Sequence, residues 1–166
     1  TKVKHMRFGF VAIDNFTKKG WVVPMESNKK EELIRAVKEV FIHIGIPEQF
    51  YSDEEGGFNS TEWKKLLVIY NIKKHIQTST HANTVERFIR TIKDLLYRRL
   101  DVGVAEGSVR KTGKSQDRRH WTTYIKEVLE KYNNTEHTTT KLKPTEATKK
   151  ENFLWTAWHI ANNARK

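Results

Sequence analysis

The stretch KEELIRAVKEVFIHIGIPEQFYSD, residues 30–53, decides the fold. Apolar residues recur every three to four positions through its first half, which predicts an amphipathic helix. Gly45 and Pro47 are typical of a helix end, and the apolar run that follows them favours a short strand toward Ser52. The periodic residues are Leu33, Ile34, Val37, Val40, Phe41 and Ile44.

Two β-prone runs precede this stretch, Phe8–Ile13 and Trp21–Met25. The polar segment Asn15–Gly20 between them predicts the turn of a β-hairpin. Asn28-Lys29-Lys30-Glu31 has the form of a capping box, which would begin the helix. A helix that lies between strands indicates an α/β fold with a mixed or parallel sheet and crossover helices.

The remaining chain predicts five more helices, one more strand and two polar loops. In order these are a helix from Asn59 to Tyr70, a strand at Asn71–Ile76, a loop at Gln77–Asn83, a helix from Thr84 to about Leu100, a flexible basic loop at about 102–119, a helix from Trp121 to Tyr132, a helix start at Pro144–Ala147 and a short helix with Trp155, Trp158 and Ile160.

Composition limits the classes of function. The 166 residues suffice for one domain, which we expect to span 1–166 as a fragment of something longer. A formal charge of +11 suggests a polyanionic partner, with nucleic acid the leading candidate and a merely basic soluble domain the alternative. The absence of cysteine excludes disulfides and thiol nucleophiles and fits a reducing compartment. No apolar run approaches the roughly 20 residues of a membrane span.

Asp53 and Glu86 are the candidate metal ligands. Asp53 ends a predicted strand directly before Glu54, Glu55 and a glycine pair, and a carboxylate at a strand end is rigid and exposed. Divalent metals that serve nucleotidyl transfer are held by a few such carboxylates aimed at one point. The alternatives are a turn aspartate or a surface acid cluster.

Glu86 stands at the head of a basic helix face. Glu86, Arg90 and Lys93 are spaced i, i+4 and i+7, so they share one stripe, with Arg87 beside it. An acid there could hold metal while the cations hold phosphates. The alternative is an ordinary salt bridge between Glu86 and Arg90 on a solvated face.

The histidines and tryptophans give no independent site. The seven histidines show no metal-ligand spacing and are predicted to lie at the surface or in loops. The tryptophans fall at helical spacings inside apolar faces, which favours a role as core anchors over one as base-stacking platforms.

Four phrases together resemble the catalytic core of retroviral-type integrases, the D,D,E superfamily. They are Phe10–Pro24, Tyr51–Phe58, Thr80–Lys93 and the closing phrase from Tyr132 through Pro144–Ala147, and they cover nearly the whole chain in the family's order. The wording around Asp53 and Glu86 is most similar to integrases of Maverick/Polinton-type DNA transposons.

The resemblance implies a ribonuclease-H-like fold, a mixed five-stranded sheet with helices on both faces. It implies two Mg²⁺ or Mn²⁺ ions, 3′-end processing and strand transfer of DNA, and a homodimer or higher oligomer. Asp53 and Glu86 would be catalytic metal ligands, and Arg87, Arg90 and Lys93 would contact DNA. The location would be nuclear for a eukaryotic element and otherwise intracellular.

The chain also departs from the family pattern. The gap between Asp53 and Glu86 is slightly short, and Glu54 stands where the family often has Asn. The family's first catalytic aspartate lies on a strand before Phe8–Ile13, so we expect this fragment to lack its first strand and to be inactive alone. Asp14 matches the end of the second strand and is the weakest catalytic candidate. The alternatives are an integrase-derived DNA-binding or assembly module and a ribonuclease-H-type nuclease.

Overall fold

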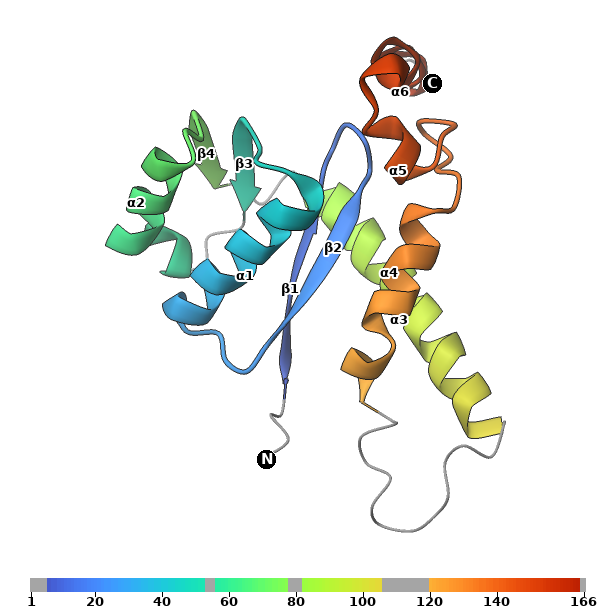
Figure 1. Ribbon diagram of the computed structural model, residues 1–166, viewed down its shortest axis with the longest axis horizontal. Coiled ribbons are helices and arrows are strands. Elements are labelled where there is room, and N and C mark those ends of the chain that lie inside the picture. The colour runs from blue at the N-terminus through green and yellow to red at the C-terminus, as the bar shows by residue number, and fades with distance from the viewer. Residues whose placement is uncertain (1–5, 53–55, 78–81, 106–119, 165–166) are drawn as a thin grey trace. The chain divides into compact units, whose positions relative to one another are not determined.

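The computed structural model describes residues 6–52, 56–77, 82–105 and 120–164 (Figure 1). The chain divides into two compact units. The first contains the residues up to Ala12 and the segment Trp21–Glu86, and the second contains Ile13–Gly20 and Arg87–Lys166. In the part of the chain that is described, no helix is long and apolar enough to cross a membrane.

The predicted hairpin is confirmed. Strand β1 (Phe8–Ile13) pairs with β2 (Gly20–Met25). The turn between them closes through hydrogen bonds between the backbones of Asp14 and Lys19 and of Lys18 and Asp14, both 2.9 Å long. Lys18 takes the left-handed conformation, with φ of 62°, which lets the chain reverse within a few residues.

Helix α1 (Lys30–Ile44) buries the apolar face that the sequence predicts. Gly45 ends it with φ of 110°, a conformation that glycine adopts at little cost. The predicted capping box is wrong, because the N-cap is Lys29 and its side chain makes no capping bond. The carboxylate of Glu32, not Glu31, instead accepts a 3.3 Å bond from the Glu26 backbone N–H.

A parallel crossover follows α1, as predicted. Strand β3 (Gln49–Ser52) pairs in parallel with β4 (Lys74–Gln77), and the 3₁₀ turn η1 (Gly56–Asn59) and helix α2 (Thr61–Ile69) lie between them in sequence. Ser60 caps α2 by accepting a 3.2 Å bond from the Trp63 backbone N–H. The register places Phe50 opposite His75 and Ser52 opposite Gln77.

One hydrophobic core joins these elements of the first unit. It brings together side chains of β2, α1, η1 and α2, and partly buried residues of β1 and β3 pack against it. Trp63 is its largest member and is 1% exposed. The core residues are Val23, Met25, Leu33, Ala36, Val37, Val40, Phe41, Phe58, Trp63, Leu66 and Ile72.

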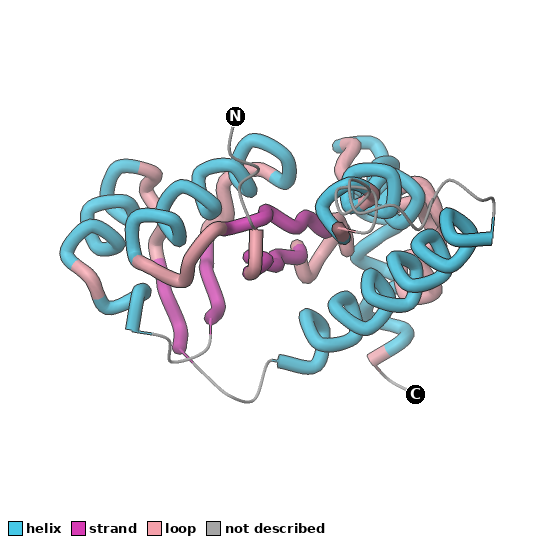
Figure 2. The backbone as a smooth tube through the Cα atoms, turned by 90° about the horizontal axis from the view of Figure 1, so that it is seen from below, coloured by secondary structure: helices cyan, strands magenta, loops and turns pink. Residues whose placement is uncertain are grey.

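Helices dominate the second unit, as Figure 2 shows by their cyan colour. Helix α3 begins in the first unit and continues beyond the predicted end near Leu100, so that residues 102–105 of the predicted loop are helical. The rest of that loop, 106–119, lies outside the described residues. The elements are α3 (Ala82–Ala105), η3 (Trp121–Thr123), α4 (Ile125–Asn133), α5 (Pro144–Ala147), η4 (Lys150–Asn152) and α6 (Phe153–Asn163).

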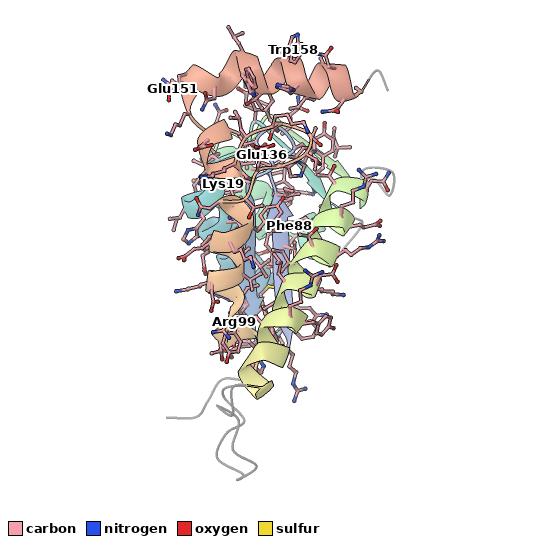
Figure 3. All side chains as sticks on the ribbon, turned by 90° about the vertical axis from the view of Figure 1, so that its right-hand side faces the viewer. Lys19, Phe88, Arg99, Glu136, Glu151 and Trp158 are labelled. Carbon is pink, nitrogen blue, oxygen red and sulfur yellow. The ribbon has the colours of Figure 1, made fainter. Side chains whose placement is uncertain are left out.

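Helices α3 and α4 are inclined to each other (Figure 3), and side-chain contacts join them at two places. The Phe88 and Tyr132 rings lie 4.7 Å apart at one end. At the other end, Arg99 donates a 2.8 Å bond to the Glu127 carboxylate and lies over the Tyr124 ring. These contacts connect α3 to α4 within the second unit.

The strands of the described residues form two separate pairs, β1–β2 and β3–β4, instead of the single five-stranded sheet that the resemblance implied. The mixed α/β class does not depend on one continuous sheet, because β2, α1, η1 and α2 share one hydrophobic core. The assignment of one catalytic-core domain to 1–166 stays a prediction.

Candidate active site

Glu86 lies on the exposed side of the first turns of α3. Glu86 is the fifth residue of α3 and lies beyond the first turn, where the helix dipole has little effect. Within the described residues, no ion pair joins its carboxylate to Arg90, so the ordinary salt-bridge interpretation finds no support. Glu86 is therefore accessible to an external cation.

The three candidate DNA-binding cations follow Glu86 on the same helix. Arg87, Arg90 and Lys93 are all exposed, whereas Phe88 and Ile92 are buried on the opposite face. At 1.5 Å of rise per residue, Lys93 lies about 10 Å along the axis from Glu86. The helix therefore presents Glu86, then three exposed cations, and then the exposed acid Asp94 directly after Lys93.

Asp53, the other candidate ligand, lies outside the described residues, as do Glu54 and Glu55. Ser52, which precedes Asp53 directly, is the last residue of β3. The structure therefore places the strand end that leads into Asp53, and that end has well-defined contacts.

Ser52 belongs to a hydrogen-bonded chain that the sequence analysis missed. Its Oγ lies 2.9 Å from Nε2 of His75, and the Trp63 indole N–H donates a 3.2 Å bond to Nδ1 of the same ring. The His75 ring also contacts the rings of Phe50 and Phe58, each with centroids 5.7 Å apart. His75 is thus a partly buried ring in β4 among aromatic residues, and the expectation that the histidines lie at the surface or in loops is wrong for this residue.

These contacts fix the tautomer of His75. An indole N–H can only donate, so Nδ1 must carry a lone pair, and the neutral ring then bears its hydrogen on Nε2. That hydrogen is donated to the Ser52 Oγ. Burial lowers the pKa of His75, which favours the same neutral form. The sequence carries no spacing signal for this chain of bonds, because the strand pairing that brings Ser52 and His75 together is tertiary.

Asp14 closes the hairpin turn. Its Oδ2 accepts bonds from the Thr17 backbone N–H at 3.0 Å and from the Thr17 hydroxyl at 2.5 Å, and its Oδ1 accepts from the Phe16 backbone N–H at 3.2 Å. Both carboxylate oxygens thus accept hydrogen bonds that stabilise the hairpin turn. A catalytic role for Asp14 stays a prediction.

The same turn is fastened to α4. The Tyr132 hydroxyl donates to the Lys18 carbonyl at 3.1 Å, and burial raises the pKa of Tyr132 to about 12, so the hydroxyl keeps its proton. The Asn133 side chain bonds both backbone groups of Gly20 at 2.9 and 3.0 Å. Burial lowers the pKa of the Lys18 ammonium, which Asp14 partly counters.

The donors fit a hard divalent cation in part. Exposed carboxylate oxygens, such as those of Glu86, are the ligands that Mg²⁺ and Mn²⁺ prefer. Asp14 fits less well, because its oxygens already accept three bonds. Within the residues that the structure describes, no three His, Asp or Glu side chains gather into a metal site.

Helix α6 exposes its aromatic residues, contrary to the core role predicted for them. Trp155 and Trp158 are 52% and 62% exposed, and Leu154 is 79% exposed. Figure 3 shows Trp158 on the outer side of α6. Periodicity identified the helix correctly, but no other described element covers this face. In contrast, Trp63 is a core anchor as predicted.

The structure is similar to solved integrase structures. The HTLV-2 integrase catalytic core domain in complex with magnesium, in its trimeric form, gives a TM-score of 0.68 at 20% identity, covering 85% of this chain and 84% of that chain. Its dimeric form gives 0.66 at 20% identity, with coverages of 84% and 82%. A simian T-cell lymphotropic virus intasome in complex with the PP2A regulatory subunit B56 gamma gives 0.66 at 16% identity, covering 82% of this chain and 46% of that chain.

No family model and no curated protein matches the sequence. At these identities the similarity concerns the fold. The predicted ribonuclease-H-like class is confirmed, and the chain has the fold of the retroviral integrase catalytic core.

Proposed function

We propose that this protein is an integrase-type polynucleotidyl transferase that processes DNA 3′ ends and joins them to target DNA. The observation that carries the proposal is the integrase-core fold together with an exposed acid, Glu86, at the head of a basic face of α3. The order of the four sequence phrases supports it. The wording around Asp53 and Glu86 supports an origin in a Maverick/Polinton-type element.

In strand transfer, a DNA 3′-hydroxyl oxygen attacks a phosphorus atom of target DNA. A new P–O bond forms, the P–O bond to the target's 3′ oxygen breaks, and the proton of the attacking hydroxyl passes to solvent. A pair of Mg²⁺ or Mn²⁺ ions supplies activation of the attacking oxygen and stabilisation of the leaving one. Asp53 and Glu86 would hold these ions, and Arg87, Arg90 and Lys93 would bind the phosphates.

Removing either proposed ligand is expected to weaken metal binding. We expect Asp53→Asn and Glu86→Gln each to lower Mn²⁺ affinity at least about tenfold, since even outer partners of a metal site commonly contribute that much. Electron paramagnetic resonance of free Mn²⁺ measures the affinity. A strand-transfer assay on DNA tests the separate expectation that the chain, lacking its first strand, is inactive alone.

Asp94→Asn is the matched control, because Asp94 is an exposed acid two turns further along α3. Unchanged Mn²⁺ affinity in both ligand variants would contradict the proposal. Asp14→Asn tests the third candidate, because a ligand role predicts weaker Mn²⁺ binding, whereas a turn role predicts lower stability alone.

Two other functions remain as alternatives. An integrase-derived DNA-binding or assembly module would bind DNA with the same salt dependence but would bind no Mn²⁺ through Asp53 and Glu86. A ribonuclease-H-type nuclease would cleave nucleic acid without joining DNA ends. The Mn²⁺ titration separates the first alternative from the integrase, and the strand-transfer assay separates the second.

We further propose that the protein associates with itself through α6. The similar HTLV-2 cores have dimeric and trimeric forms. Helix α6 contains no Asp, Glu, Lys or Arg, so it is a surface where two copies of a strongly basic chain can meet without charge repulsion. Its exposed aromatic residues would supply the apolar contact area.

A charge on α6 is expected to disrupt this association. Trp158→Lys should weaken self-association at least about tenfold, because a buried unpaired cation opposes contact. Sedimentation velocity over a concentration series measures the effect. Val68→Lys is the control, since Val68 is 80% exposed on α2. Equal loss in both variants would contradict a specific role for α6.

A further inference from the structure

The chain of bonds Trp63–His75–Ser52 connects a rigid helix start to the end of a strand. The Ser60 cap holds the Trp63 backbone, and the Trp63 ring is fixed between Phe50 and Phe58 at 5.0 and 4.9 Å. With the indole immobile, its N–H can hold Nδ1 of His75 in one orientation. The Nε2–H on the opposite side of the imidazole is then directed at the Ser52 Oγ.

The strand pairing makes this contact possible. His75 lies opposite Phe50 in the parallel register, and Phe50 and Ser52 share one face of β3 because side chains alternate along a strand. The imidazole therefore reaches diagonally from its own pair partner to the last residue of β3. Its two ring nitrogens hydrogen-bond with Ser52 of β3 and Trp63 of α2. The ring itself packs against Phe50 and Phe58.

We propose that His75 is a positioning residue, which holds the end of β3 through Ser52, the residue that directly precedes the proposed metal ligand Asp53. The proposal rests on the proposed function, because it assigns His75 a use only if Asp53 binds metal. It goes further by predicting that metal affinity depends on an uncharged imidazole as well as on the carboxylates. Groups that hydrogen-bond around metal ligands commonly change metal affinity 10- to 100-fold.

Three substitutions of His75 test its two hydrogen bonds separately. His75→Phe keeps an aromatic ring and removes both bonds. His75→Gln places an amide N–H near the position of Nε2, so it can still donate to Ser52. His75→Asn places a carbonyl oxygen near the position of Nδ1, so it can still accept from Trp63 but loses Ser52.

Mn²⁺ affinity of the full chain and the Trp63 indole N–H resonance are the two measurements. Trp63→Phe assigns the resonance. We expect His75→Phe and His75→Asn to weaken Mn²⁺ binding about tenfold, and His75→Gln to restore it to within about threefold of the original. The indole resonance should move upfield in the Phe and Gln variants, which lose its acceptor, and stay further downfield in the Asn variant, which keeps one. A general packing role would instead make Mn²⁺ affinity follow thermal stability in all three.

Ser52→Ala removes the hydrogen bond to His75 from the other side and leaves the aromatic cluster intact. It should weaken Mn²⁺ binding about as much as His75→Asn does. Unchanged Mn²⁺ affinity in Ser52→Ala, while Asp53→Asn lowers it, would overturn the role of His75 and leave the proposed function standing. If Asp53→Asn itself leaves Mn²⁺ affinity unchanged, the proposed function fails and the role of His75 fails with it.

Discussion

Asn133→Ala is expected to lower the free energy of unfolding by about 3 kcal/mol. The Asn133 side chain is buried, its Oδ1 accepts from the Gly20 backbone N–H at 3.0 Å, and its Nδ2 donates to the Gly20 carbonyl at 2.9 Å. Alanine removes both partners and leaves two buried backbone groups unsatisfied, each of which costs about 1–3 kcal/mol.

The surroundings of Gly20 prevent an easy repair. A Cβ at Gly20 would lie 2.3 Å from Cζ of Phe88, so the backbone is covered by a ring that is itself 2% exposed. Water has little room to replace the lost amide. Nearly the full cost of losing the two hydrogen bonds between Asn133 and Gly20 should therefore appear in the measured free energy of unfolding.

Urea unfolding followed by circular dichroism measures the effect. Asn134→Ala is the matched control, because Asn134 is the next residue, is exposed, and bonds the Glu130 carbonyl at the helix end. It should cost less than about 1 kcal/mol. If both variants lose equal stability, the buried bridge to Gly20 is not the source of the effect.

Sequence periodicity predicted most of the elements. The alternation and turn chemistry of Phe8–Met25 predicted the hairpin, and the spacing of apolar residues predicted α1 and α3 with their buried faces. These features are local, since each depends on which residues repeat at the period of a strand or a helix. For the same reason the boundaries differ by a few residues, as at the end of α3.

The missed features depend on tertiary structure. The capping box at Asn28 matched a motif, but the helix starts after Lys29. Trp158 and Trp63 both fit an apolar helical pattern, yet only Trp63 is covered by other elements. His75 showed no metal-ligand spacing, and its bonds to Ser52 and Trp63 arise only when β3 and β4 pair. Local patterns identify the apolar face of a helix, but they do not decide whether another element covers that face.

The candidate site was predicted by resemblance more than by spacing. Nothing in the pattern around Asn133 explained why the closing phrase should matter, and the structure supplies a reason in its two bonds to Gly20. For Glu86, the helical spacing predicted an exposed acid in line with Arg90 and Lys93, and the structure has all three exposed. The role of that face in binding DNA stays a prediction.

Neutralising the basic face of α3 is expected to weaken DNA binding about a hundredfold at physiological salt. Each cation that pairs with a phosphate contributes about 0.9 to the slope of log affinity against log salt. The triple variant Arg87→Gln, Arg90→Gln and Lys93→Gln should therefore reduce that slope by about 2.7. Fluorescence anisotropy with a duplex of arbitrary sequence, repeated at several salt concentrations, measures both quantities.

The control must remove the same charge from another surface. Lys126, Lys131 and Lys150 are exposed on α4 and η4, so their triple glutamine variant loses an equal charge. If binding depends only on the net charge of +11, the two triple variants will lose affinity equally, and the assignment of α3 fails. If α3 is the contact surface, the control will keep most of the salt slope, because its cations release no counterions from the bound DNA.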